Sequence, residues 1–161
     1  MDKLSKNSVL LLVLIVSIIA LISAYFIQYV LGHQPCNLCL IERVPYVLAI
    51  IIIFLTYKFK QLERKLIIIL ILLFLFSSIL SIYHFGIEQG FIQESLVCDL
   101  QGGSKVLSKE ELLLELQNKT VSCKDVTFKL FGLSLTTFNI FISITIVLIL
   151  TKIFLDYEKN K

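Results

Sequence analysis

Long runs of apolar residues, separated by short polar segments, dominate the 161-residue chain. The apolar runs cover approximately residues 8–31, 40–58, 66–84 and 130–151. A helix needs about 20 apolar residues to cross the hydrocarbon part of a bilayer, with a range of roughly 17–25. The pattern therefore predicts an all-α integral membrane protein, a single domain over residues 1–161 that folds as a four-transmembrane-helix bundle.

The first two runs each allow a second interpretation. The apolar stretch between Arg43 and Lys58 reaches the length of a span only if Leu40 and Ile41 join it and the lysines at its far end extend toward the surface. A buried or re-entrant segment is the alternative for this second run.

The first run could be a cleaved signal peptide, but it exceeds the usual apolar region of about 7–15 residues and lacks a small-residue cleavage site. We expect it to be retained as a helix.

The composition agrees with a protein of the bilayer. Hydrophobic residues make up 57% of the chain, charged residues only 17%, and the mean hydropathy is +0.90. A soluble domain typically carries about 25% charged residues. The net charge of +3 is too small to indicate nucleic-acid binding, and basic residues do not alternate with aromatic ones in any patch. We therefore expect no nucleic-acid partner.

Positive charges collect in three segments: before the first run, between the second and third, and after the fourth. They are Lys3, Lys6, Lys58, Lys60, Arg64, Lys65, Lys152, Lys159 and Lys161. Segments 32–39 and 85–129 lie on the other side, and the longer one mixes lysines with many acidic residues. Because positive charge marks the cytoplasmic segments of membrane proteins, both termini are predicted to be cytoplasmic and these two loops to face outward.

The cysteines occupy only the two outward loops. Cys36 and Cys39 fall in the first, and Cys98 and Cys123 in the second. An even number of cysteines confined to exported loops indicates disulfide chemistry. Zinc is the competing use, but its ligands normally come in tight pairs or with histidines at fixed spacing. The second pair is widely split, and His33 and His84 fit no such spacing, so no metal site is predicted.

Residues 34–43 hold the densest group of reactive side chains. A Cys36–Cys39 bridge closes too small a ring to add much stability, but the spacing suits redox exchange, because the partner thiol can resolve a mixed disulfide. Arg43 could stabilise a thiolate or the charge on an oxygen that accepts electrons. The next helix begins near Cys39 or, because Pro45 suits a first turn, after Arg43. Glu42 is interpreted as an interfacial partner of Arg43.

Three further features complete the prediction from residues alone. His84 ends the third run, and an ionisable residue at a membrane boundary indicates a functional site. His33 is predicted to lie in a loop. Residues 108–116 predict a short amphipathic helix on the membrane surface, which would keep the cysteines of the second loop near the bilayer. Its apolar face consists of Leu112, Leu113 and Leu116.

These motifs, in this order, resemble the DsbB family of disulfide bond formation proteins. The resemblance extends from the outer end of the first predicted span to the middle of the fourth. It rests on Pro35-Cys36-x-x-Cys39-Leu40-x-x-Arg43-x-Pro45-Tyr46, Tyr83-His84-x-Gly86-x-Glu88-Gln89-Gly90, Cys98, Val121-Ser122-Cys123-Lys124-Asp125, and Phe131-Gly132-Leu133-Ser134-Leu135 followed by Asn139.

The resemblance implies a multi-pass protein of the bacterial inner membrane that oxidises a periplasmic DsbA-like dithiol protein and passes the electrons to a membrane quinone. Cys98 would form the mixed disulfide with that thioredoxin-fold partner. Cys123 would then exchange with Cys36, and Cys39 would pass electrons to the quinone. Loops 32–39 and 85–129 would be periplasmic.

The resemblance also implies where the quinone binds. Arg43 matches an arginine near the quinone, and His84 matches a polar residue near the same site. Ubiquinone is expected rather than menaquinone. The sequence departs from the family in having no tryptophan, with Phe91 and Phe138 at positions where relatives often carry one.

Two alternatives remain at this stage. One is a thiol oxidase similar to vitamin K epoxide reductase, although in that family the cysteine pair near the quinone comes late in the bundle. The other is a non-enzymatic four-span protein whose outer loops are held by stable disulfides. An oxidase should instead show a readily exchanged Cys36–Cys39 pair.

Overall fold

The computed structural model describes residues 3–93, 98, 123–124, 129–130 and 132–159. In this part of the chain, four helices are long and apolar enough to cross a membrane, and these are Lys6–Tyr29, Asn37–Lys58, Lys60–Glu88 and Leu135–Asp156. The predicted four-helix architecture is therefore confirmed. The predicted amphipathic helix at 108–116 lies outside the described residues.

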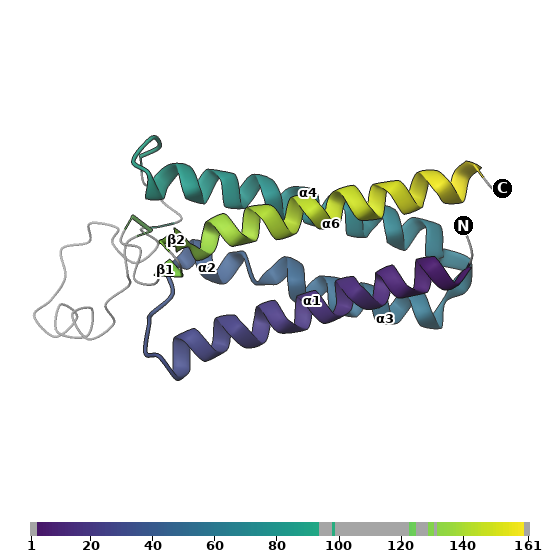
Figure 1. The fold of residues 1–161 in the computed structure, drawn as a ribbon, viewed down its shortest axis with the longest axis horizontal. Helices are drawn as coiled ribbons and strands as arrows, with labels where there is room; N and C mark the ends of the chain where they lie inside the picture. Colours follow the sequence, from purple (N-terminus) through teal and green to yellow (C-terminus); the bar gives the residue numbers. More distant parts are fainter. Residues whose placement is uncertain (1–2, 94–97, 99–122, 125–128, 131, 160–161) are drawn as a thin grey trace, which may run out of the picture.

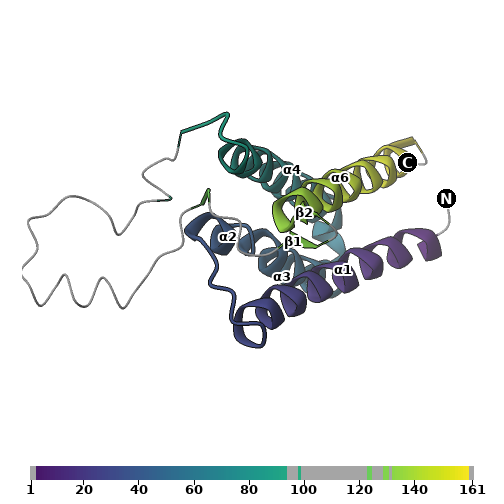
Figure 2. The ribbon, with the colours of Figure 1, turned by 60° about the vertical axis from the view of Figure 1, so that its left-hand side comes forward.

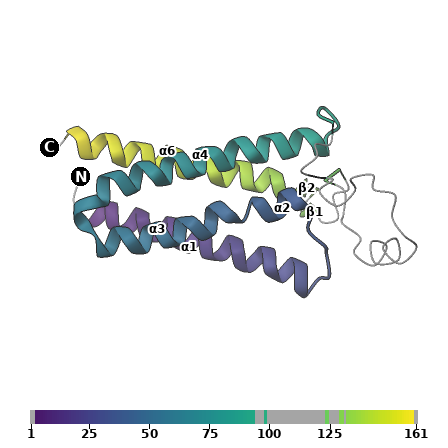
Figure 3. The same cartoon turned by 180° about the vertical axis from the view of Figure 1, so that it is seen from behind.

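The elements follow one another in a simple order. They are α1 (Lys3–Tyr29), α2 (Asn37–Ile41), α3 (Val44–Lys58), the 3₁₀ turn η1 (Lys60–Leu62), α4 (Glu63–Glu88), β1 (Lys129–Leu130), β2 (Leu133–Ser134) and α6 (Leu135–Lys159). The strands pair antiparallel, Lys129 with Ser134 and Leu130 with Leu133. Helix α3 packs against both α1 and α4, and α4 makes its most extensive contact with α6. These pairs lie side by side in Figures 1 and 3.

The two ends of the bundle differ in what they carry. Both termini lie at one end, and α2 with the two short strands lies at the other (Figures 1 and 2). The first end also holds an ion pair between Lys6 and Glu63. The second end carries the cysteines of the first loop. The geometry thus separates a lysine-rich end from a cysteine-bearing end.

Apolar side chains face both inward and outward. A buried cluster joins the four long helices and comprises Leu10, Val13, Tyr46, Ala49, Ile53, Leu70, Phe74, Ile146 and Leu150. On the outside, Ile22, Phe54 and Leu148 are 62%, 61% and 65% exposed. Soluble proteins rarely present large continuous apolar surfaces. A lipid environment accounts for this surface, because lipid tails solvate such side chains.

Polar side chains cross-link the helices inside the bundle. Asn139 of α6 donates from Nδ2 to Ser81 Oγ of α4 at 2.7 Å, and its Oδ1 accepts from the hydroxyl of Tyr46 of α3. Ser77 and Ser143 also lie within 3.2 Å of each other between α4 and α6. Because lipid cannot satisfy a polar group, such bonds favour one arrangement of the helices.

We expect Asn139→Leu to lower the free energy of unfolding by about 1–2 kcal/mol, because interhelical hydrogen bonds in membranes contribute roughly 0.6 kcal/mol on average and up to about 1.7. The change removes two such bonds. Unfolding in mixed detergent, followed by circular dichroism, would measure the loss. Thr145→Leu is a matched control, because the Thr145 hydroxyl is exposed and bonds only within its own helix, to Phe141 O. Equal stability of the two variants would contradict the prediction.

The helical conformation is interrupted between α2 and α3 at the cysteine-bearing end. Cys36 is the N-cap of α2, Glu42 is its C-cap, and Pro45 stands in the first turn of α3. Proline tolerates that position because the amide it lacks has no helical partner there. The two starting points expected for the second helix both occur, since a short helix precedes Glu42 and the long one begins at Val44.

Glycines shape the end of α4 beside this break. Gly90 has φ +76°, a left-handed conformation that ends the helix without the penalty of a side chain. The chain then turns back, and the amides of Phe91 and Ile92 donate to Gly86 O. A Cβ at Gly86 would lie 2.7 Å from Ile92 Cδ1, so a larger residue there would displace the end of the Ile92 side chain.

Candidate active site

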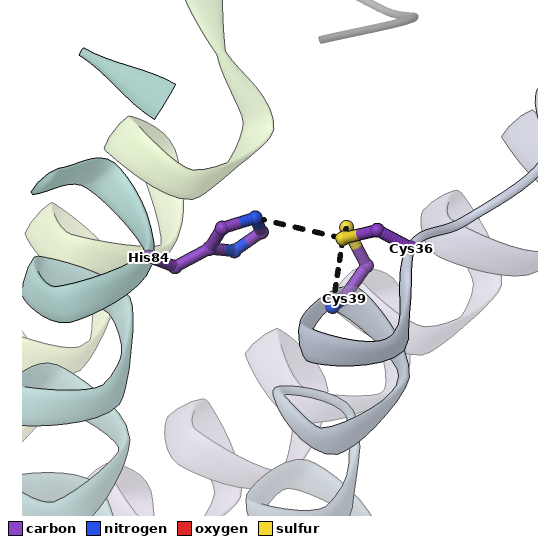
Figure 4. A group of neighbouring side chains, drawn as sticks. All are labelled: Cys36, Cys39 and His84. Carbon is purple, nitrogen blue, oxygen red and sulfur yellow. Dashed lines mark hydrogen bonds between the residues drawn. The ribbon is translucent and has the colours of Figure 1, made fainter. Parts of the chain in front are cut away.

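The first cysteine pair lies where α2 begins. The Cys36 Sγ accepts a hydrogen bond from the backbone amide of Cys39 at 3.3 Å. The two Sγ atoms are 2.6 Å apart, and both cysteines are free thiols (Figure 4). Cys36 is buried, whereas Cys39 is partly exposed. A disulfide has an S–S distance of about 2.05 Å, so the two sulfurs need move only slightly to form one when an acceptor takes two electrons and two protons leave.

His84 approaches this pair from α4. Its Nε2 lies 3.5 Å from Cys36 Sγ, as Figure 4 shows, and the side chain is almost fully buried. Its Nδ1 lies 3.1 Å from Glu42 Oε1 and 3.3 Å from Thr136 Oγ1. Thr136 also donates to Glu88 Oε1 at 2.6 Å. The histidine therefore contacts the Cys36 thiol through Nε2 and the Glu42 carboxyl group through Nδ1, and Thr136 links it to the carboxyl group of Glu88.

Sequence reasoning missed two of these acidic residues. Glu42 was expected to pair with Arg43 at the interface, and this was wrong, because Glu42 is buried and bonds His84. The break after α2 directs Glu42 inward. Glu88 follows His84 by four residues, which places both side chains on one helical face. That spacing is a sequence signal that could have found Glu88, and the motif from Tyr83 to Gly90 also contains this residue.

Arg43 is held by α1. Its Nη1 donates to Gln28 Oε1 at 2.6 Å, and its guanidinium lies 5.1 Å from the centre of the Tyr25 ring. The ring face attracts a cation and leaves the other donors of the planar group available. Arg43 is therefore fixed at the cysteine-bearing end, and among the described residues its guanidinium keeps hydrogen-bond donors beyond the one that Gln28 accepts.

An apolar cavity of about 390 Å³ opens beside these groups. Side chains of α1 and α6, among them Val16, Ala20, Phe138 and Ile142, form its apolar part. Its polar part includes Cys39, Arg43 and His84. A mainly apolar cavity with a few convergent polar groups is typical of a small-molecule site.

The second cysteine pair meets the first. Cys98 and Cys123 form a disulfide across 25 residues of chain. Both pack with Cys36, Leu38 and Ile87 in one buried cluster, which Cys39 and Tyr83 border. Cys123 also lines the cavity. The structure thus brings all four predicted cysteines, with Arg43 and His84, to one end of the bundle. His33 lies in the loop between α1 and α2, as expected.

The surroundings of Cys36 favour its thiolate. The hydrogen bond from the Cys39 side chain lowers the pKa of Cys36 most, burial raises it, and the hydrogen bond from His84 lowers it further, to about 5 in all. Thiolates are the reactive form in exchange, so this cysteine is the more nucleophilic of the pair near neutral pH.

We expect alkylation of reduced Cys36 to rise with pH through a midpoint near 5, because the thiol is protonated below its pKa of about 5 and ionised above it. An ordinary cysteine would give a midpoint near about 8.5. Iodoacetamide labelling, located by mass spectrometry, would measure the profile. Cys39→Ala removes the main cause of the shift, so its midpoint should move upward. An unchanged midpoint in that variant would contradict this account.

A bundle of membrane-length helices with two cysteine pairs gathered at one end is typical of a membrane thiol–disulfide oxidoreductase. The sequence model described as "Disulfide bond formation protein DsbB" matches residues 6–153. The chain therefore belongs to the DsbB family, whose members use quinones in general. It is also similar to "Uncharacterized protein RP370" of Rickettsia prowazekii (strain Madrid E), with 32% identity over 164 residues, 99% of this chain and 94% of that protein.

Proposed function

We propose that this protein reoxidises a periplasmic DsbA-like dithiol protein and passes the electrons to a membrane quinone, so that exported proteins acquire disulfides. One observation carries the proposal. Both cysteine pairs belong to a single buried cluster, and an apolar cavity between membrane spans adjoins it. Electrons that arrive at a loop disulfide therefore have a short route to a lipid-soluble acceptor.

The proposed relay exchanges one disulfide for the next. A partner thiolate attacks Cys98 and breaks the Cys98–Cys123 bond, and the released Cys123 thiolate attacks Cys36 of an oxidised Cys36–Cys39 pair. The partner's second thiol then breaks its bond to Cys98 and leaves as a disulfide. Cys98 attacks Cys123, which restores the second pair. Two electrons remain on Cys36 and Cys39 as a dithiol.

A quinone ring suits the cavity. The apolar residues of α1 and α6 match the ring and its isoprenoid tail, and Cys39, Arg43 and His84 line the polar part of the cavity. When bound, the quinone supplies a two-electron acceptor that also takes up two protons. Arg43 would hold a quinone oxygen with the donors that Gln28 leaves free. His84, between Cys36 and the carboxyl groups of Glu42 and Glu88, can accept a thiol proton and pass it onward.

The membrane arrangement follows from the charge pattern. Both termini and the lysine-rich link between α3 and α4 would lie in the cytoplasm, with the cysteines at the periplasmic face of the bacterial inner membrane. The common end of the two termini supports this placement (Figure 1). A DsbA-like partner is then on the same side as the Cys98–Cys123 disulfide.

The experiment mixes purified protein with a reduced DsbA-like protein and a quinone, and follows quinone absorbance. We expect one quinone to be reduced for each partner disulfide formed, faster with ubiquinone than with menaquinone. Faster reduction of menaquinone would overturn only the choice of quinone. If neither quinone is reduced, the oxidoreductase proposal fails, and a protein stabilised by loop disulfides takes its place.

A further inference from the structure

We propose that the reduced form also binds a zinc-class metal ion, held by Cys36, Cys39 and His84, and that this metal inhibits electron transfer. The ligand atoms of these three residues all lie within 4.8 Å of one another. The chain spacing of the two histidines gave no sign of such a site, since α4 brings His84 to the cysteines from 48 residues away. Metal binding is independent of the proposed function, but the inhibition rests on it.

The distances suit tetrahedral zinc. With Zn–S bonds of about 2.3 Å and Zn–N bonds of about 2.0–2.1 Å, a bound sulfur and nitrogen stand about 3.6 Å apart. Cys36 Sγ and His84 Nε2 are already 3.5 Å apart. Two bound sulfurs stand about 3.8 Å apart, so the present 2.6 Å between Cys36 and Cys39 must widen. Rotation of the partly exposed Cys39 side chain can provide that change.

Glu42 prepares the histidine for a metal. A metal-binding histidine normally places its second ring nitrogen against a carboxylate, which fixes the ring and makes the ligand nitrogen more basic. Here Nδ1 lies 3.1 Å from Glu42 Oε1, while Nε2 faces the sulfur of Cys36. The imidazole is therefore oriented as a ligand before any metal arrives.

Glu88 places a further carboxyl group beside His84, outside the three residues whose ligand atoms lie within 4.8 Å of one another. Its Oε1 lies 3.9 Å from His84 Nε2, the nitrogen that faces the thiols. Its Oε2 is buried and has no hydrogen-bond partner among the residues that the structure describes. The side chain is only 6% exposed, so water does not readily satisfy this atom. A buried carboxyl group beside the histidine favours a cation at the thiol pair, because opposite charges attract strongly where water is excluded.

The chemistry makes binding dependent on redox state. Each thiol exchanges its proton for a sulfur–zinc bond, so binding releases up to two protons and transfers no electron. A Cys36–Cys39 disulfide has no thiolate to offer and should not bind. Once bound, the sulfurs cannot form the disulfide that releases electrons.

The test uses the full chain without quinone, reduced or oxidised, and adds Zn²⁺. Mass spectrometry of the intact complex should find one zinc for each reduced chain and none for the oxidised chain. Cys98→Ser with Cys123→Ser should bind equally, which excludes the second pair as ligands. Co²⁺ in place of Zn²⁺ should give the thiolate charge-transfer absorption of a tetrahedral site.

Substitutions of histidine and glutamate residues test which side chains hold the zinc ion. His84→Ala should weaken zinc binding at least about tenfold, and Glu42→Gln about tenfold, as for other residues that hydrogen-bond a metal ligand. Glu88→Gln should also weaken it, whereas His33→Ala should change it less than twofold. The proposed site would be wrong if the oxidised chain, or the His84→Ala variant, bound zinc as tightly as the reduced wild-type chain. If zinc binds without slowing the oxidation of the partner, or if the slowing persists after a chelator removes the zinc, inhibition by zinc is rejected. Either result would leave the metal site in place.

The two proposals can fail separately. Quinone reduction without zinc binding removes the metal site and leaves the proposed function intact. Stoichiometric zinc binding by a chain that reduces no quinone would remove the proposed function instead.

Discussion

Cys36→Ser is expected to lower quinone reduction at least about a thousandfold, as the loss of a residue that forms the covalent intermediate does in other enzymes. Cys36 is the member of its pair with the lowered pKa, and it packs in the same cluster as Cys98 and Cys123. A serine hydroxyl can form no disulfide, so electrons could enter the second pair but not leave it. Absorbance of the quinone in the presence of excess reduced partner would measure the loss.

A second measurement shows where the relay stops. A partner protein whose resolving cysteine is replaced by serine should still attach covalently to Cys36→Ser, because Cys98–Cys123 is intact there. The same partner should not attach to Cys98→Ser. Non-reducing electrophoresis would separate the adducts. Normal turnover of Cys36→Ser, or an adduct with Cys98→Ser, would contradict the order of the relay.

Arg43→Gln is expected to lower kcat/KM for the quinone about a hundredfold, the lower end of the effect of removing one preorganised donor to a developing charge. The guanidinium is fixed by Gln28 and Tyr25 and lines the cavity. The variant keeps a polar side chain but loses the charge. Initial rates at several quinone concentrations, with partner in excess, would give kcat and KM separately.

Two variants sharpen this prediction. Arg43→Lys keeps the charge but not the planar set of donors, so its loss should be smaller than that of Arg43→Gln. Lys58→Gln removes a cation from the other end of the same span and should leave kcat/KM within about twofold, since surface charges away from the site contribute little. Adduct formation at Cys98 should be unchanged in all three. A selective fall in adduct formation, with normal quinone kinetics, would remove Arg43 from the quinone site.

The sequence was sufficient for the architecture. Apolar runs of the length of a bilayer specify spanning helices almost independently of their neighbours, because lipid forces each backbone to satisfy its own hydrogen bonds. The lysine distribution then predicted which segments share a side, and all four cysteines fell in the two loops predicted to face outward. The family resemblance, confirmed by the match over residues 6–153, rested on the same local motifs.

Only the tertiary structure decided the partners inside the site. Glu42 bonds His84 across 42 residues of chain, and Thr136 reaches His84 across 52. Arg43 pairs with Gln28 rather than with its neighbour Glu42. These contacts depend on how α4 and α6 pack beside the break between α2 and α3. The length and polarity of a segment set its depth in a membrane, but they leave its rotation and its neighbours to side-chain packing.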